Sequence, residues 1–284
     1  MPRTARRLRQ PSTLLSRETT ISELTKYAGT AMPCRRVFGK AVDCTMKYEE
    51  LRARVVEANR LLPGYDLVKF TWGNVSEADR KAGVFAIKPS GVAYDDLTPE
   101  KIVVLDFEGH VLEGDMNPSS DTKTHVQLYQ AFPEIGGIVH THSPYAAAWA
   151  QAGRDIPCCG TTHADYFYGA IPCARHLTPE EIREDYEKNT GLCIAETFRK
   201  RSIQPAYVPG VICASHGAFA WGKDGDEAVY HAVVLEEVAK MAALTMLIAG
   251  QAVSAPQCYM DKHFLRKHGP DAYYGQKQEE GKKG

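Results

Sequence analysis

Two histidines, His140 and His142, stand two residues apart at the end of an apolar stretch, and they constrain what this chain can form more than any other feature. The stretch, 135–143 (IGGIVHTHS), is dense in apolar residues and shows no helical period, which predicts a buried strand. Side chains at positions i and i+2 of a strand point to the same face. The two imidazoles should therefore lie side by side, as two ligands of one metal ion must.

A third histidine and a carboxylate extend this candidate metal site. His216 ends a second apolar stretch, 211–216 (VICASH), and Asp121 lies upstream in 118–121 (PSSD). Three imidazoles and a carboxylate suit Zn²⁺ or a similar divalent ion. The alternative is that the histidines are satisfied core residues. Two of them on one strand face argue against it, because burying unpaired imidazoles is costly.

Composition indicates an ordinary globular protein. The chain has 284 residues and a formal net charge of −1, which favours neither a nucleic-acid nor a membrane partner. The longest apolar stretch, 241–249, is far too short to span a bilayer. None of the 8 cysteines forms a Cys-x-x-Cys pair, so we expect reduced thiols in a cytoplasmic enzyme.

The first 45 residues differ from the rest of the chain. They carry nine Lys or Arg against three Asp or Glu and have no periodic apolar face, which predicts a disordered basic extension. The extension lacks the apolar core of a secretory signal. One alternative interpretation is a transit peptide. Another is that the start of the chain is assigned too far upstream and that Met46 is the natural first residue. We expect one domain over 46–276 and a charged tail over 277–284.

Periodicity and turn residues predict alternating helices and strands. Thr178 begins the best-defined helix, because a Thr N-cap is followed by Pro at the first position and then by acids. That helix should run to about residue 199 with an interruption at Gly191. The other predicted helices cover 48–62, 121–131, a short Ala-rich segment ending at 152, 226–248, and part of 261–274. The predicted strands cover 67–72, 84–87, a hairpin of 102–107 with 110–112, 138–142, and one ending at 216.

Three short polar stretches have the composition of anion-binding loops. They are 71–76 (TWGNVS), 88–91 (KPSG) and 118–120 (PSS), the last directly before a predicted helix. Free N–H groups and the positive dipole end of a helix N-terminus suit a phosphate, and Lys88 would add a full charge. The alternative is that each stretch is only a turn.

Taken together, these motifs resemble those of the L-ribulose-5-phosphate 4-epimerases of the class II aldolase/epimerase family. The resemblance covers about residues 46–276. It rests on TWGNVS (71–76), KPSG (88–91), PSSDT (118–122), GIVHTHS (137–143), GTTHADYFYG (160–169), SHGAFAWG (215–222), DKHFLRKHG (261–269) and YG (274–275).

The resemblance implies a fold, a set of site residues and an assembly. The fold is an α/β fold in three layers (α/β/α), with a central, mostly antiparallel sheet flanked by helices. The implied assembly is a homotetramer with sites at subunit interfaces. The implied metal is Zn²⁺, with Mn²⁺ or Co²⁺ as alternatives, held by Asp121, His140, His142 and His216. The implied phosphate site consists of Asn74, Lys88, Ser90, Gly91, Ser119 and Ser120. Asp165 and Tyr274, the latter from a neighbouring subunit, are the implied acid/base pair, with Thr161, Glu187 and His263 in support.

The implied reaction is the epimerisation of L-ribulose 5-phosphate to D-xylulose 5-phosphate at C4, by cleavage and re-formation of the C3–C4 bond. Such epimerases serve L-arabinose catabolism and pathways of ascorbate or xylulose. Two alternatives stay open. A class II sugar-phosphate aldolase would release its fragments, although such aldolases typically carry Glu where this chain has Asp121. A non-catalytic scaffold such as the adducin head would lack the metal ligands.

Overall fold

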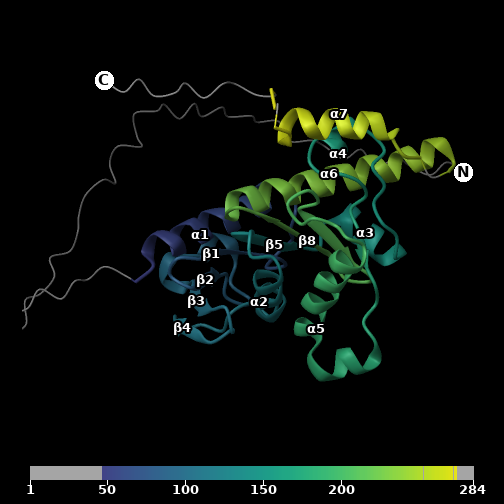
Figure 1. The fold of residues 1–284 in the computed structure, drawn as a ribbon. Helices are drawn as coiled ribbons and strands as arrows, with labels where there is room; N and C mark the ends of the chain where they lie inside the picture. Colours follow the sequence, from purple (N-terminus) through teal and green to yellow (C-terminus); the bar gives the residue numbers. More distant parts are fainter. Residues whose placement is uncertain (1–46, 252, 271, 274–284) are drawn as a thin grey trace, which may run out of the picture. The chain divides into compact units, whose positions relative to one another are not determined.

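A single eight-stranded sheet organises the part of the chain that the computed structural model describes, residues 47–251, 253–270 and 272–273 (Figure 1). Its strand order is β4-β3-β2-β1-β5-β8-β7-β6. Neighbouring strands are antiparallel except β6 and β7, which are parallel. The strands are β1 (Asn74–Asp79), β2 (Val84–Ile87), β3 (Val103–Asp106), β4 (Val111–Glu113), β5 (Gly137–Thr141), β6 (Cys173–Ala174), β7 (Gly210–Cys213) and β8 (Ala218–Gly222).

Helices cover both faces of the sheet, which confirms the predicted three layers. Helix α1 (Glu49–Gly64) and the first part of α6 (Gly225–Ala249) pack on one face, where Val139 and Ala220 point. Helices α2 (Thr122–Ala131) and α5 (Pro179–Lys200) pack on the other, where Ile138 and Trp221 point (Figure 1). Alternation along each strand thus builds two apolar cores.

The remaining elements are short or peripheral. Helix α3 (Pro144–Ala152) packs against α6 and β7, and the short α4 (Thr161–Ala164) packs against α7 (Gln257–His268). Two 3₁₀ turns, η2 (Tyr94–Asp96) and η3 (Pro99–Lys101), connect β2 to β3. No helix within the described ranges is long and apolar enough to cross a membrane.

One strand prediction was wrong, and the reason is physical. Residues 67–72 form turns in which Leu67 and Val68 are buried without joining the sheet. The strand lies instead at Asn74–Asp79, which overlaps a stretch whose composition is typical of a polar loop. Its buried positions include Ser76 and Glu77, whose polar groups are satisfied by hydrogen bonds, so hydropathy could not reveal it.

Helix α5 begins as predicted but bends elsewhere. Thr178 forms a capping box with Glu181, each accepting a hydrogen bond from the other's backbone N–H. The expected interruption at Gly191 is wrong, because the non-helical residue is Asp185, at φ −165° and ψ 89°. Gly191 instead allows α5 to approach α2 closely, since a Cβ there would lie 2.6 Å from the Cβ of Gln127. Strands β6 and β8 and helix α4 were not predicted, and the predictions for residues 1–45 and 277–284 lie outside the described ranges.

Candidate metal centre and phosphate pocket

The three predicted histidines converge at one edge of the sheet. His140 lies in β5 and His142 just past its end, and their Nε2 atoms are 3.0 Å apart. His216 lies in the tight turn between β7 and β8, and its ring centroid is 4.8 Å from that of His140 and 5.1 Å from that of His142. One ligand atom from each ring lies within 4.8 Å of the others. The predicted convergence of these residues is confirmed.

The chemistry of these rings fits a divalent cation. His140 Nδ1 lies 2.9 Å from the carbonyl oxygen of Ala218, which can only accept, so Nδ1 carries a proton and Nε2 is the atom that faces His142. Burial lowers the pKa of His216 to about 3 and also lowers the pKa of His142, so both are neutral at pH 7. His216 Nδ1 is buried and has no hydrogen-bond partner within the described residues. Neutral imidazoles with unshared lone pairs are the form that binds Zn²⁺.

Gly217 is required for this close packing of the rings. A Cβ at this position would lie 2.5 Å from the carbonyl oxygen of Thr141 and 2.9 Å from a ring carbon of His142. We expect Gly217→Ala to lower the free energy of unfolding by about 1–3 kcal/mol and to weaken metal binding, because the His142 ring must move. Chemical denaturation and metal titration would measure the two effects. Gly64→Ala is a suitable comparison, because a Cβ there meets nothing within 4 Å and the backbone of Gly64 is not in the left-handed region.

Asp121 lies beside the histidines as the N-cap residue of α2. Its Oδ2 accepts hydrogen bonds from Asn74 Nδ2 at 2.8 Å and from Ser119 Oγ at 3.4 Å. Burial would raise the pKa of Asp121, but His140, His125 and the Asn74 amide outweigh burial and hold that pKa below its usual range. The three histidines form the metal-capable group by themselves, and Asp121 lines the same cavity as an anion.

All six predicted phosphate-binding residues line the cavity that contains these groups. The cavity has a volume of about 490 Å³. The loops after β2 and before α2 are joined by hydrogen bonds from Ser90 N to Asn117 O (3.0 Å) and from Ser119 N to Lys88 O (3.1 Å). The lining residues include the three histidines, Asp121, Glu187 and the predicted set Asn74, Lys88, Ser90, Gly91, Ser119 and Ser120.

Lys88 brings an unneutralised positive charge to this cavity. Its side chain is only 2% exposed, and burial lowers its pKa to about 8. Its Nζ donates to the carbonyl oxygen of Pro89 at 3.4 Å and lies 5.0 Å from the centroid of the Tyr94 ring. Within the described ranges no carboxylate forms an ion pair with it. A buried ammonium of this kind is most stable beside a bound anion.

Three other predicted site residues lie elsewhere in the chain. Thr161 lies in α4, Asp165 directly follows that helix, and His263 lies in α7. None of the three lines the cavity. The Asp165 carboxylate accepts hydrogen bonds from Arg266 at 2.9–3.1 Å and lies 3.1 Å from His263 Nδ1. Tyr274 lies outside the described residues.

Tyr186 is a cavity residue that the sequence did not reveal. It follows the bend at Asp185, lines the cavity, and its ring centroid is 5.8 Å from that of His216. The bend is a property of the folded helix rather than of a recognisable motif. In the sequence, only the adjacent Glu187, which the family resemblance implies as a site residue, indicated that this part of α5 reaches the site.

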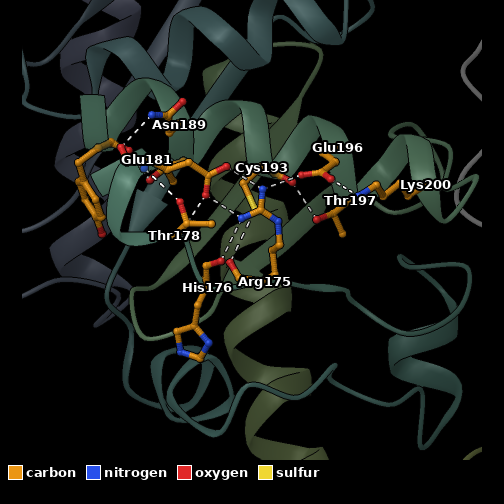
Figure 2. A network of polar contacts seen from close by, with 11 residues as sticks. Arg175, His176, Thr178, Glu181, Asn189, Cys193, Glu196, Thr197 and Lys200 are labelled. Atoms are coloured by element: carbon orange, nitrogen blue, oxygen red, sulfur yellow. Dashed lines mark hydrogen bonds and ion pairs between the residues drawn. The ribbon is translucent and has the colours of Figure 1, made fainter. Parts of the chain in front are cut away.

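A polar network around Arg175 ties the segment before α5 to that helix (Figure 2). Arg175 binds Glu181 through two hydrogen bonds of 2.8 Å and Glu196 through one of 2.9 Å. The adjacent His176 lies 2.9 Å from the hydroxyl of Ser215, the residue before His216. These contacts join the first turn of α5, the body of that helix and the turn that carries His216.

The fold and the histidine cluster together define the class of protein. Residues 53–243 match the family described as Class II Aldolase and Adducin N-terminal domain, and the chain belongs to this family. The predicted family is therefore confirmed at this level, and the three histidines are consistent with its use of a divalent ion such as Zn²⁺.

Particular solved structures resemble the chain. An L-fuculose 1-phosphate aldolase is 26% identical, with a TM-score of 0.63, covering 75% of this chain and 94% of its own. YgbL from Klebsiella pneumoniae is 21% identical, with a TM-score of 0.61 and coverages of 77% and 99%. An L-fuculose-1-phosphate aldolase from Thermus thermophilus is 24% identical, with a TM-score of 0.57 and coverages of 72% and 98%. The last two likenesses establish the fold alone.

Proposed function

We propose that this protein is a metal-dependent L-ribulose-5-phosphate 4-epimerase, which interconverts L-ribulose 5-phosphate and D-xylulose 5-phosphate. One observation carries the proposal. A buried, unneutralised Lys88 and three converging histidines open into the same cavity of about 490 Å³. A small molecule with a phosphate at one end and chelating oxygens at the other matches this arrangement.

The position of the inverted carbon sets the type of reaction. C4 of ribulose 5-phosphate is not adjacent to the C2 carbonyl, so its hydrogen is not acidic enough for direct proton abstraction. Breaking the C3–C4 bond and re-forming it on the other face of the aldehyde inverts C4 without that step. A divalent ion held by His140, His142 and His216 would supply Lewis acidity toward the C2 and C3 oxygens.

The phosphate residues would keep the cleaved fragment in place. Lys88 would neutralise the phosphate, and the hydroxyls of Ser90, Ser119 and Ser120 would donate to its oxygens. Cleavage produces glycolaldehyde phosphate and the enediolate of dihydroxyacetone. The first fragment, anchored by its phosphate, can rotate its aldehyde and re-add before it escapes. Retention of this fragment distinguishes an epimerase from an aldolase.

A proton must leave the C4 hydroxyl during cleavage and return after re-addition. We assign these transfers to Asp165 and Tyr274. Since Asp165 does not line the cavity of its own chain, it would serve the cavity of a neighbouring copy in a homotetramer. Exposed apolar side chains in the last turn of α6 and in α7 support such an assembly. They include Leu247 (79% exposed), Ile248 (86%) and Leu265 (52%).

Asp165→Asn should retain the metal and lose turnover by about 100-fold or more, because the amide cannot accept the proton. Metal content and steady-state turnover of the same preparation give the two measurements. Asp155→Asn is a matched control, because Asp155 is also an arginine-bound aspartate, and neither it nor its partner Arg201 lines the cavity. Full activity of Asp165→Asn would remove Asp165 from the acid/base role.

The strongest competing function is that of a class II sugar-phosphate aldolase. It is favoured by the 26% identity to an L-fuculose 1-phosphate aldolase, a figure that covers 94% of that protein. An adducin-like scaffold without catalysis is disfavoured by the convergence of His140, His142 and His216. The aldolase would differ from the epimerase by releasing its fragments. The scaffold would differ from it by binding no metal.

The test is incubation of the zinc-loaded protein with L-ribulose 5-phosphate, with and without a chelator. Chelator-sensitive formation of D-xylulose 5-phosphate without free fragments is the expected result. Release of glycolaldehyde phosphate and dihydroxyacetone would instead establish a lyase. Absence of turnover in metal-replete protein would contradict the proposed substrate while leaving the metal centre in place.

A further inference from the structure

Tyr94 lies behind Lys88 and is not one of the residues that line the cavity. It begins the turn η2, shortly after the loop 88–91, and its side chain is only 4% exposed. The Lys88 Nζ lies over the face of its ring, 5.0 Å from the centroid. Among the described residues, the other polar contact of this Nζ is the Pro89 carbonyl oxygen at 3.4 Å. An aromatic face within about 6 Å attracts a cation, most strongly where water is excluded.

The hydroxyl of Tyr94 binds a second loop of the cavity. It donates toward the carbonyl oxygens of Trp72 and Gly73, the latter at 3.0 Å. Both of these residues line the cavity. Burial raises the pKa of Tyr94, so the hydroxyl keeps the proton that it donates. One buried side chain therefore connects the loop at Gly73 with the loop that carries Lys88.

The contact between ring and ammonium opposes the cost of burying Lys88. The lysine side chain is 2% exposed, and no described carboxylate forms an ion pair with it. Burial disfavours the ammonium, which lowers the pKa of Lys88 to about 8. The face of the Tyr94 ring stabilises the same ammonium. A neutral lysine cannot neutralise a phosphate, so the ring favours the form of Lys88 that binds an anion.

We propose that Tyr94 is a positioning residue of the anion site. Its ring holds Lys88 in the ammonium form, and its hydroxyl holds the loop at Trp72 and Gly73. The inference rests on the phosphate site of the proposed function, to which it adds a residue that acts through Lys88. Replacing the ring should therefore weaken anion binding only when Lys88 is present. A residue that merely fills space would weaken it equally with and without Lys88.

The test is isothermal titration of the full chain with sodium sulfate between about pH 6 and pH 9. Sulfate resembles phosphate but keeps its charge over this range, so any pH dependence comes from the protein. Tyr94→Leu should bind sulfate about 5-fold more weakly than wild type at pH 8, and within about 2-fold of wild type at pH 6. The reason is that without the ring Lys88 loses its proton about one pH unit lower. Tyr94→Phe keeps the ring and should keep the wild-type pH dependence.

The other titratable groups near Lys88 are the same in both members of each comparison. Asp95 and Asp96, which follow Tyr94 in η2, are exposed to solvent. The groups that line the cavity are Asp121, Glu187, Tyr186, His140, His142 and His216. Their titration contributes to every binding curve, so only the difference between variants reports on the ring.

A double-mutant cycle with Lys88→Met isolates the interaction between ring and ammonium. Adding Tyr94→Leu to Lys88→Met should change sulfate affinity by less than about 2-fold. Tyr129→Leu is the matched control, because Tyr129 is also buried beneath a cation, with Arg80 Cζ 5.2 Å from its ring centroid, and Arg80 does not line the cavity. This control should lose stability without changing the pH dependence of sulfate affinity.

The outcomes separate the inference from the proposed function. If wild type binds no sulfate, or Lys88→Met binds it as tightly, the phosphate site fails and the inference fails with it. If Lys88→Met weakens binding but Tyr94→Leu leaves the pH dependence unchanged, only the inference is overturned. An equal loss with and without Lys88 also overturns it. Should no Tyr94 variant fold, the absence of a nuclear Overhauser contact between the Lys88 ε-methylene and the Tyr94 ring in wild type would overturn it.

Discussion

Alanine at His216 is expected to abolish both stoichiometric metal binding and turnover. The residue supplies one of three converging imidazoles, and the turn that holds it offers no substitute ligand. We expect metal affinity to fall by more than about 100-fold, since even outer-shell changes cost about 10- to 100-fold. Turnover should fall by about 1,000-fold or more, because Lewis-acid stabilisation is worth several kcal/mol. Elemental analysis of dialysed protein and the coupled D-xylulose 5-phosphate assay would measure these losses.

His110→Ala provides the control for this experiment. His110 lies at the β3–β4 turn, where its side chain is 76% exposed and pairs with Asp106. Its replacement should leave metal content and turnover at wild-type levels. If His216→Ala retained a full equivalent of tightly bound metal, the three-histidine centre would be wrong, whatever the substrate.

Lys88→Met should weaken substrate binding strongly while it stabilises the free protein. Loss of a charged hydrogen-bond donor to the phosphate costs about 1.5–3 kcal/mol, which corresponds to roughly 10- to 150-fold in affinity. The ammonium is almost fully buried without an anionic partner, and methionine fills similar space without a charge. Isothermal titration with L-ribulose 5-phosphate should show weaker binding. Chemical denaturation should show a higher free energy of unfolding.

The same residue gives a pH dependence with a definite sign. Burial lowers the pKa of Lys88 from 10.5 to about 8, so in the free protein the ammonium loses its proton as pH rises through 8. Substrate affinity should therefore decline above about pH 8 in wild type and stay flat in Lys88→Met. Between about pH 8 and 10.5 the unfolded chain binds the proton that the folded protein has released, so this residue makes the free protein more stable as pH rises.

At neutral pH, keeping the buried Lys88 side chain charged lowers the free energy of unfolding by on the order of 3 kcal/mol. Lys88→Met should restore part of this free energy. Lys101→Met is a useful comparison, because Lys101 is only partly buried and is hydrogen-bonded to the backbone carbonyl of Asp96. A Lys88→Met variant that binds substrate as tightly as wild type would show that Lys88 does not bind the phosphate.

Local patterns predicted the parts of this protein that depend on neighbours in sequence. The helix start at Thr178 follows from capping chemistry, and the shared orientation of His140 and His142 follows from the period of a strand. The same reasoning missed β1, because the polar Ser76 and Glu77 are buried there and are satisfied by partners distant in sequence. It also placed the bend of α5 at Gly191 rather than at Asp185, since the pairing of Asp185 with Lys123 is a tertiary contact.

The sequence by itself determined which groups are available: three histidines at strand ends, a lysine between short polar loops, and an aspartate before a helix. Only the tertiary structure decided that these groups share one cavity. Antiparallel pairing of β1, β5 and β8 brings Asn74, His140 and the His216 turn together across long stretches of chain. It also decided that Lys88 is buried without a counter-charge and that Asp165 faces α7 rather than this cavity. Burial and long-range proximity are properties of the packed fold, and no local pattern encodes them.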